Sequence, residues 1–220
     1  MIQPDEIIRS NRKTLAITVD SFGRLIVRAP MRYSKERIFA FIEEKENWIL
    51  RKKSEKQGAG IQLPPENLNG YPLMLLGKKC TVRVVQTAKV GYDAEANEIY
   101  LPEKNPRDRL IKWLKNNAKR IFTEVTARTA VTMGTSYRSV TVTSARSRWG
   151  SCSGENAIRY SFRLLYAPKE VIEYVVVHEL AHTKHKNHSK AFWAEVATYV
   201  PDWKTKRKWL KLHGALMEIF

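Results

Sequence analysis

The chain has 220 residues, of which 43% are hydrophobic and 28% charged; this excludes an intrinsically disordered protein and allows one sizeable core or two small ones. It has no run of about 18 apolar residues, which argues against a membrane span, and its first ten residues lack the pattern of a secretory signal. Two cysteines, Cys80 and Cys152, are too few for a disulfide framework, so we expect a cytoplasmic protein with no membrane partner.

The net charge of +17 is the strongest compositional signal. It favours a polyanionic partner such as nucleic acid, a nucleotide or an acidic protein. A solvated basic surface without any cognate anion explains the same charge, because charge alone carries no base readout. Both interpretations stay open at this point.

The N-terminal part predicts a hairpin, a helix and a linker. Residues 15–19 and 25–28 alternate in polarity about a turn at 20–23, which is typical of a β-hairpin. Ser34 is placed to cap a helix whose apolar residues share one face. Residues 54–70 are rich in glycine, proline and asparagine, which predicts a linker.

A second β region follows the predicted linker. Residues 71–76, 79–86 and 98–101 have the composition of short strands, with turns at 77–78 and 91–97.

A long helix is predicted to start at Asn105 and Pro106, because proline suits the first helical turn. Its expected apolar face comprises Leu110, Trp113, Leu114, Ile121 and Val125. Its other positions are largely basic, which suits phosphate binding or a solvated helix face.

After this helix, residues 139–143 predict a strand, and residues 157–162 predict its hairpin partner. Near the C-terminus, a last helix is predicted from Pro201-Asp202 to His213-Gly214. Its expected core residues are Trp203, Trp209, Leu210 and Leu212.

The pattern most specific to chemistry lies at His178-Glu179-Leu180-Ala181-His182. Residues four apart lie on one helix face, so the two imidazoles can bind a single metal ion. Glu179 lies at the rim of that face, where a carboxylate can reach a metal-bound water without being a ligand. Pro168 and the apolar spacing of Val171, Tyr174 and Val175 place this pattern on a helix.

His188 follows six positions later, between a polar turn at 184–187 and Ser189, which can cap a second helix. A bend there can bring His188 back to the ion as the third ligand, and zinc is the expected metal. The alternative is a buried helix whose histidines only make hydrogen bonds.

Three segments together carry a family resemblance: RSRWGSCS at 146–153, YVVVHELAH at 174–182 and NHSKAFW at 187–193. With them the chain resembles the YgjP-like metallopeptidase family, a zincin group akin to SprT-like and WLM proteases. The resemblance is strongest over about 107–212. It implies His178, His182 and His188 as zinc ligands and Glu179 as the catalytic carboxylate. Thr183 departs from the usual apolar residue of this pattern, which concerns helix packing.

In zincins a sheet edge borders the cleft, and extended substrate can add to it as a strand. By resemblance, the hairpin around residues 146–156 is that border, and Arg146, Arg148 and Trp149 are the expected substrate-binding residues. The alternative places Trp149 in the core, with the arginines on the surface or bound to carboxylates. Cys152 is expected near the zinc, with nothing to indicate that it is a ligand.

The expected function is a zinc-dependent hydrolase of the metallopeptidase type, in which metal-activated water attacks a peptide bond and Glu179 is the general base. Candidate oxyanion donors are Tyr160, Tyr199, Arg148 and His185. Its substrate would be unfolded protein or peptide. The resemblance also implies a nucleotide pyrophosphatase acting on UTP, and a nucleic-acid binder with structural zinc is the third alternative; Glu179 argues against the last.

The predicted fold class is α+β: a zincin-like C-terminal catalytic domain with a small antiparallel sheet and helices, preceded by a β-rich N-terminal region. The expected boundaries are 1–70 for the N-terminal region and 71–220 for the hydrolase domain, with a catalytic core at about 105–213.

Overall fold

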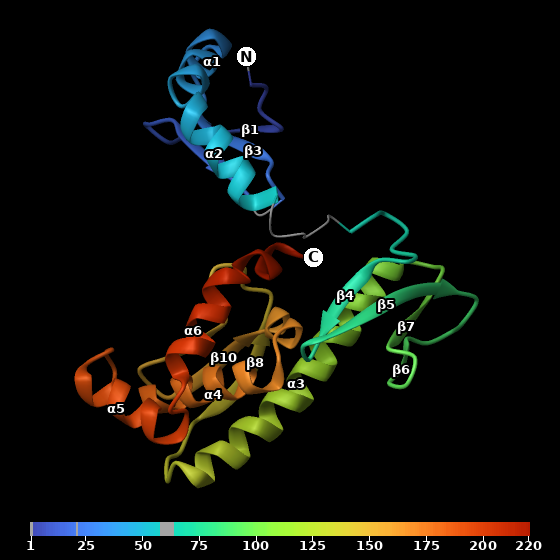
Figure 1. The fold of residues 1–220 in the computed structure, drawn as a ribbon, viewed down its shortest axis with the longest axis vertical. Coiled ribbons are helices and arrows are strands. Elements are labelled where there is room, and N and C mark those ends of the chain that lie inside the picture. The colour runs from blue at the N-terminus through green and yellow to red at the C-terminus, as the bar shows by residue number, and fades with distance from the viewer. Residues whose placement is uncertain (1, 21, 58–63) are drawn as a thin grey trace. The chain divides into compact units, whose positions relative to one another are not determined.

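The structure is a computed structural model that describes residues 2–20, 22–57 and 64–220. The chain divides into two compact units, Met1–Leu63 and Pro64–Phe220 (Figure 1). The division falls inside the predicted linker, whose residues 58–63 lie outside the described part of the chain. The start of that predicted linker is helical.

The first unit contains a three-stranded sheet in the order β1-β3-β2. Its strands are β1 (Glu6–Ser10), β2 (Ala16–Val19) and β3 (Leu25–Pro30). The predicted hairpin is confirmed, since β2 and β3 pair antiparallel; residue 21 of its turn lies outside the described part. β1 pairs parallel to β3 and was not predicted.

Two helices, α1 (Lys35–Glu44) and α2 (Glu46–Gln57), occupy the region predicted as one helix. Ser34 caps α1 as predicted, because its Oγ accepts a hydrogen bond from the Arg37 N–H at 3.3 Å. The break at Lys45 is not visible in the apolar spacing, since Ile42 and Ile49 on either side of it are both buried. The core of this unit combines helix and sheet residues: Val19, Leu25, Val27, Ala29, Ile38, Ile42 and Ile49.

The second unit begins with a four-stranded sheet in the order β4-β5-β7-β6. Its strands are β4 (Pro72–Leu75), β5 (Lys78–Val85), β6 (Gly91–Asp93) and β7 (Glu98–Pro102). β6 lies in the segment predicted only as a turn, where it pairs antiparallel to β7.

Helix α3 (Pro106–Thr132) starts at the predicted proline and is the scaffold of this unit (Figure 1). It lies against the four-stranded sheet, against the three-stranded sheet that follows it in this unit, and against α4 (Lys169–Lys184). Its buried residues recur every fourth position: Leu110, Leu114, Ala118, Phe122, Thr126 and Ala130. The predicted stripe was partly wrong, because Trp113, Ile121 and Val125 flank this row and are only half-buried.

The last sheet has the order β8-β10-β9, with strands β8 (Ser139–Thr143), β9 (Gly150–Cys152) and β10 (Ala157–Ser161). The predicted hairpin of β8 with β10 is wrong, because these strands pair parallel. β9 lies in the segment expected to be a loop, and it pairs antiparallel with one edge of β10. β8 therefore pairs with the other edge of β10. The sheet is therefore mixed.

The C-terminal region is helical: η1 (Phe162–Tyr166), α4 (Lys169–Lys184), α5 (Lys190–Tyr199), α6 (Trp203–Leu212) and η2 (Gly214–Glu218). α6 lies against α4, and none of its side chains is buried. The expected core positions on this helix are wrong: Leu212 is 66% exposed, and the other three, Trp203, Trp209 and Leu210, are only half-buried. The predicted α+β class is confirmed. No helix in the described part of the chain is both long and apolar enough to cross a membrane.

Candidate metal centre

Helix α4 carries the first two histidines, and the start of the helix and its buried apolar side chains determine which way they face. Pro168 precedes the helix, and its carbonyl accepts hydrogen bonds from the N–H groups of Val171 and Ile172, both at 3.0 Å. The apolar side chains of α4 are buried, which fixes the rotation of the helix about its axis. His178 and His182, four residues apart, therefore lie on one face at the edge of this buried surface.

The turn between α4 and α5 returns the chain toward that face. α4 ends at Lys184, and α5 starts after Ser189, whose Oγ accepts a hydrogen bond from the Phe192 N–H at 3.3 Å. His188 directly precedes this cap. The predicted cap is confirmed, and it fixes where the chain re-enters a helix beside α4.

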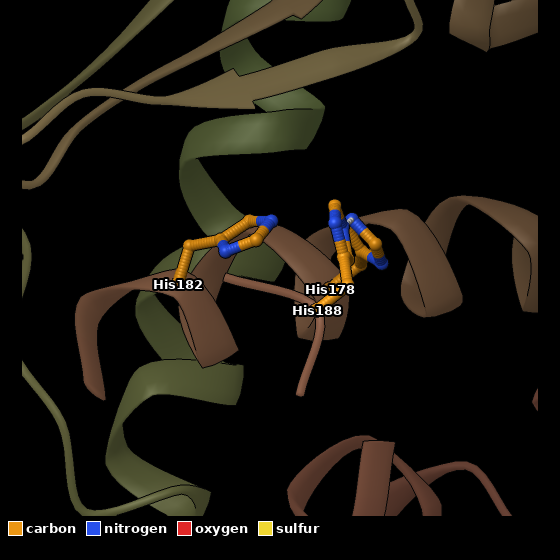
Figure 2. A group of neighbouring side chains, drawn as sticks. All are labelled: His178, His182 and His188. Carbon is orange, nitrogen blue, oxygen red and sulfur yellow. Dashed lines mark hydrogen bonds between the residues drawn. The ribbon is translucent and has the colours of Figure 1, made fainter. Parts of the chain in front are cut away.

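The three imidazoles converge (Figure 2). One ligand atom from each of His178, His182 and His188 lies within 4.8 Å of the others. Nε2 of His178 and Nε2 of His188 face each other at 3.1 Å, a distance at which they share a proton or a cation. The alternative of two hydrogen-bonded core histidines fits less well, because Nδ1 of His178 is buried without a hydrogen-bond partner in the described part of the chain.

The protonation states of these imidazoles suit metal binding. Burial, then the neighbouring histidines, lowers the pKa of His178 to about 3, and burial lowers that of His182. Both rings are therefore neutral at pH 7, as a metal ligand must be. Nδ1 of His182 lies 3.0 Å from the His185 carbonyl oxygen, which accepts a hydrogen bond from the Nδ1–H group. Nε2 is then unprotonated, and its lone pair is available to a metal ion. The donor set fits a divalent transition metal.

Aromatic rings surround the cluster. The Phe192 ring lies 4.9, 4.5 and 4.8 Å from the rings of His178, His182 and His188. Trp193 stacks on His188 at 5.6 Å and on Trp203 of α6 at 4.1 Å. The sequence predicted no role for these rings at the site, although the NHSKAFW segment places two of them four and five residues after His188.

Glu179 follows His178 on α4, and its carboxyl group lies against Gly150 of β9. It is 5% exposed, and a Cβ built on Gly150 would lie 2.6 Å from its Oε1. Any side chain at position 150 would therefore force this carboxyl group to shift. Burial raises the pKa of Glu179 to about 8, so the ion-free protein holds a proton here at neutral pH. A nearby cation favours the ionised form instead.

A family model of the YgjP-like metallopeptidase domain matches residues 13–213. The chain belongs to the YgjP-like metallopeptidase family. Membership indicates a metal-dependent hydrolase, and the histidine cluster is a group that could hold the metal. Searches of the curated proteins and of the solved structures return no match.

The remaining candidates of this YgjP-like domain differ in their positions. Arg148 is exposed and lines a hollow beside Gly150, whereas Arg146 is exposed outside that hollow and Trp149 is half-buried. Cys152 is half-buried on β9 and is not part of the convergent group found in the described residues.

The candidate oxyanion donors differ in their burial and in their hydrogen-bond partners. Tyr160 is fully buried, its hydroxyl lies 3.1 Å from that of Thr126, and burial raises its pKa, so it belongs to the core beneath the sheet. Tyr199 and His185 are half-buried. The backbone carbonyl of His185 orients His182.

Proposed function

We propose that the protein is a zinc-dependent metallopeptidase in which His178, His182 and His188 hold the ion and Glu179 moves the proton. The observation that supports this most directly is the convergence of three imidazoles, two of them on the helix that also carries the buried carboxyl group of Glu179. Catalytic zinc sites use about three protein ligands and keep one position open, whereas structural sites are usually closed by four. No fourth ligand joins the group among the described residues.

A bound zinc ion would supply Lewis acidity and lower the pKa of water in its open position. The residues of the chain would do the rest. Glu179 in its ionised form takes a proton from the attacking water and returns it to the leaving amine. Phe192 and Trp193 keep bulk water from one side of the cluster, which strengthens electrostatic interactions there.

The test combines metal analysis with cleavage of an unfolded protein, with and without chelator. We expect about one zinc per chain and zinc-dependent cleavage. Glu179→Gln should retain the zinc but lose turnover by about 10² or more, because it keeps the shape and removes the base. Cleavage that survives either chelation or this substitution would overturn the proposal.

The alternative hydrolysis of UTP uses the same candidate ligands, and the net charge of +17 is the observation that favours it. UTP supplied to the same zinc-loaded protein separates the two reactions. Nucleic-acid binding that persists after zinc removal would support the third alternative, a nucleic-acid-associated protein.

A further inference from the structure

Strand β9 offers a free edge next to Glu179. Within the described part of the chain β9 has one neighbouring strand, β10. The Ser161 N–H donates to the Trp149 carbonyl at 2.9 Å, and the Ser153 N–H donates to the Ala157 carbonyl at 3.0 Å. Hydrogen-bonded pairs alternate in an antiparallel ladder, so the backbone groups of Gly150 and Cys152 point away from β10. They can pair with an extended peptide.

The two faces of this edge differ in chemistry. The Cα–H of Gly150 that a Cβ would replace points at Glu179, so this face looks toward helix α4. Side chains alternate along a strand, and Ser151 therefore points to the opposite face. Its partner on β10 is Arg159, which shares that face.

A hollow of about 340 Å³ lies on this opposite face. We call it the outer-face hollow. Its cations are Arg148 and Arg159, and the side chains of Ser147, Ser151 and Thr143 add hydroxyl groups. No carboxylate lines it, and within the described residues neither arginine forms an ion pair with an acidic side chain.

We propose that the outer-face hollow binds the carboxylate side chain of an acidic residue in a peptide that docks along β9. This inference rests on the proposed peptidase function and names its substrate preference. A docked strand lies about 4.8 Å from β9 and two such spacings from β10, a gap that a glutamate and Arg159 together can span. A guanidinium binds a carboxylate through two parallel hydrogen bonds, which gives a preference over the neutral amide.

The open strand edge favours a peptide over a nucleotide as the occupant. An extended chain would pair with both the N–H and the C=O groups of Gly150 and Cys152, whereas a triphosphate offers no donor to the carbonyl groups. The sequence also contains no glycine-rich phosphate loop.

The experiment measures peptide binding in the Glu179→Gln protein, so that cleavage does not interfere. A set of short unstructured peptides places a single glutamate at each position in turn. A matched set places glutamine at the same positions. At one position we expect the peptide with glutamate to bind the protein about tenfold more tightly than the peptide with glutamine. Arg159→Gln should abolish that difference, and Arg159→Glu should create a preference for lysine at the same position. Arg109→Gln is the matched control, since it removes an exposed arginine from α3 in the same unit.

Equal affinity for glutamate and glutamine at every position would overturn the inference, as would a preference that is unchanged in both Arg159 variants. UTP binding that depends on Arg159, without peptide discrimination, would overturn it in favour of a phosphate site. The proposed function is tested separately with zinc-loaded wild type. Cleavage of peptides without a preference for glutamate would refute only the proposed role of the outer-face hollow. Preferential binding of glutamate peptides without cleavage would refute only the proposed peptidase activity.

Discussion

Gly150→Ala is the most direct test of how the fold positions Glu179. The added methyl group would lie 2.6 Å from Oε1 and 2.9 Å from Cδ and Cγ of Glu179, where ordinary contacts begin at 3.4 Å. The carboxyl group must therefore move by up to about 0.8 Å, because β9 is held to β10 on its other side. A displacement near 1 Å of a reacting group can reduce the rate by about 10²-fold.

We expect Gly150→Ala to lower kcat/KM for an unfolded protein substrate by about 10- to 100-fold, which corresponds to about 1.4–2.7 kcal/mol in the barrier. Overpacking should also cost about 1–3 kcal/mol of folding stability. Zinc content should not change, because the three atoms nearest to the added methyl group all belong to Glu179, which is not a proposed ligand. Gly154→Ala is the control, since its Cβ would meet nothing within 4 Å. Wild-type activity in Gly150→Ala, or an equal loss in Gly154→Ala, would refute this account of Glu179.

Three further predictions concern stability and metal affinity. In metal-free protein, a carboxyl with a raised pKa contributes stability below its unfolded pKa of 4.5 and loses it as the pH rises through about 8. In the presence of chelator, the free energy of unfolding of Glu179→Gln should therefore exceed that of the wild type by about 1–3 kcal/mol between pH 6 and 9. A difference that does not vary with pH would contradict the raised pKa of Glu179. Trp193→Leu removes the ring stacked on His188 and should weaken zinc binding about tenfold in a competition titration, an effect that Trp193→Phe should largely restore. Gly77→Ala places a Cβ 2.9 Å from the Cα of the proline before α4, at a φ of +79°, and should cost about 2–4 kcal/mol by chemical denaturation, whereas Gly214→Ala should cost little.

Much of the candidate site follows from local sequence signals. Ser189 caps α5 through its own side chain, and the proline before α4 starts that helix, so both positions could be predicted from neighbouring residues. The spacing of His178 and His182 places them on one face without reference to the rest of the fold. The approach of His188 needed only a short turn between two predictable helices.

Long-range pairing could not be predicted in the same way. The parallel partnership of β8 and β10 depends on β9, a three-residue strand whose sequence Gly150-Ser-Cys152 has no apolar alternation. Because β9 was not predicted, the sequence could not show that Glu179 lies against Gly150. Nor could it show that Ser151 and Arg159 share one face of the sheet. Arg159 has the pattern of an ordinary solvent-facing position on a strand, and only the strand order places it in the outer-face hollow.

The attachment of α5 has a consequence for handling the protein. Phe192 and Val196 are its only buried side chains, and the Phe192 ring lies against the imidazoles. An ion held by histidines on both sides of the turn would close a ring of chain and tie α5 to α4, so that loading and local folding become one equilibrium. Stripping the ion should speed amide hydrogen exchange in α5 well before it does so in α3, and storage in strong chelators would then expose this helix to proteases.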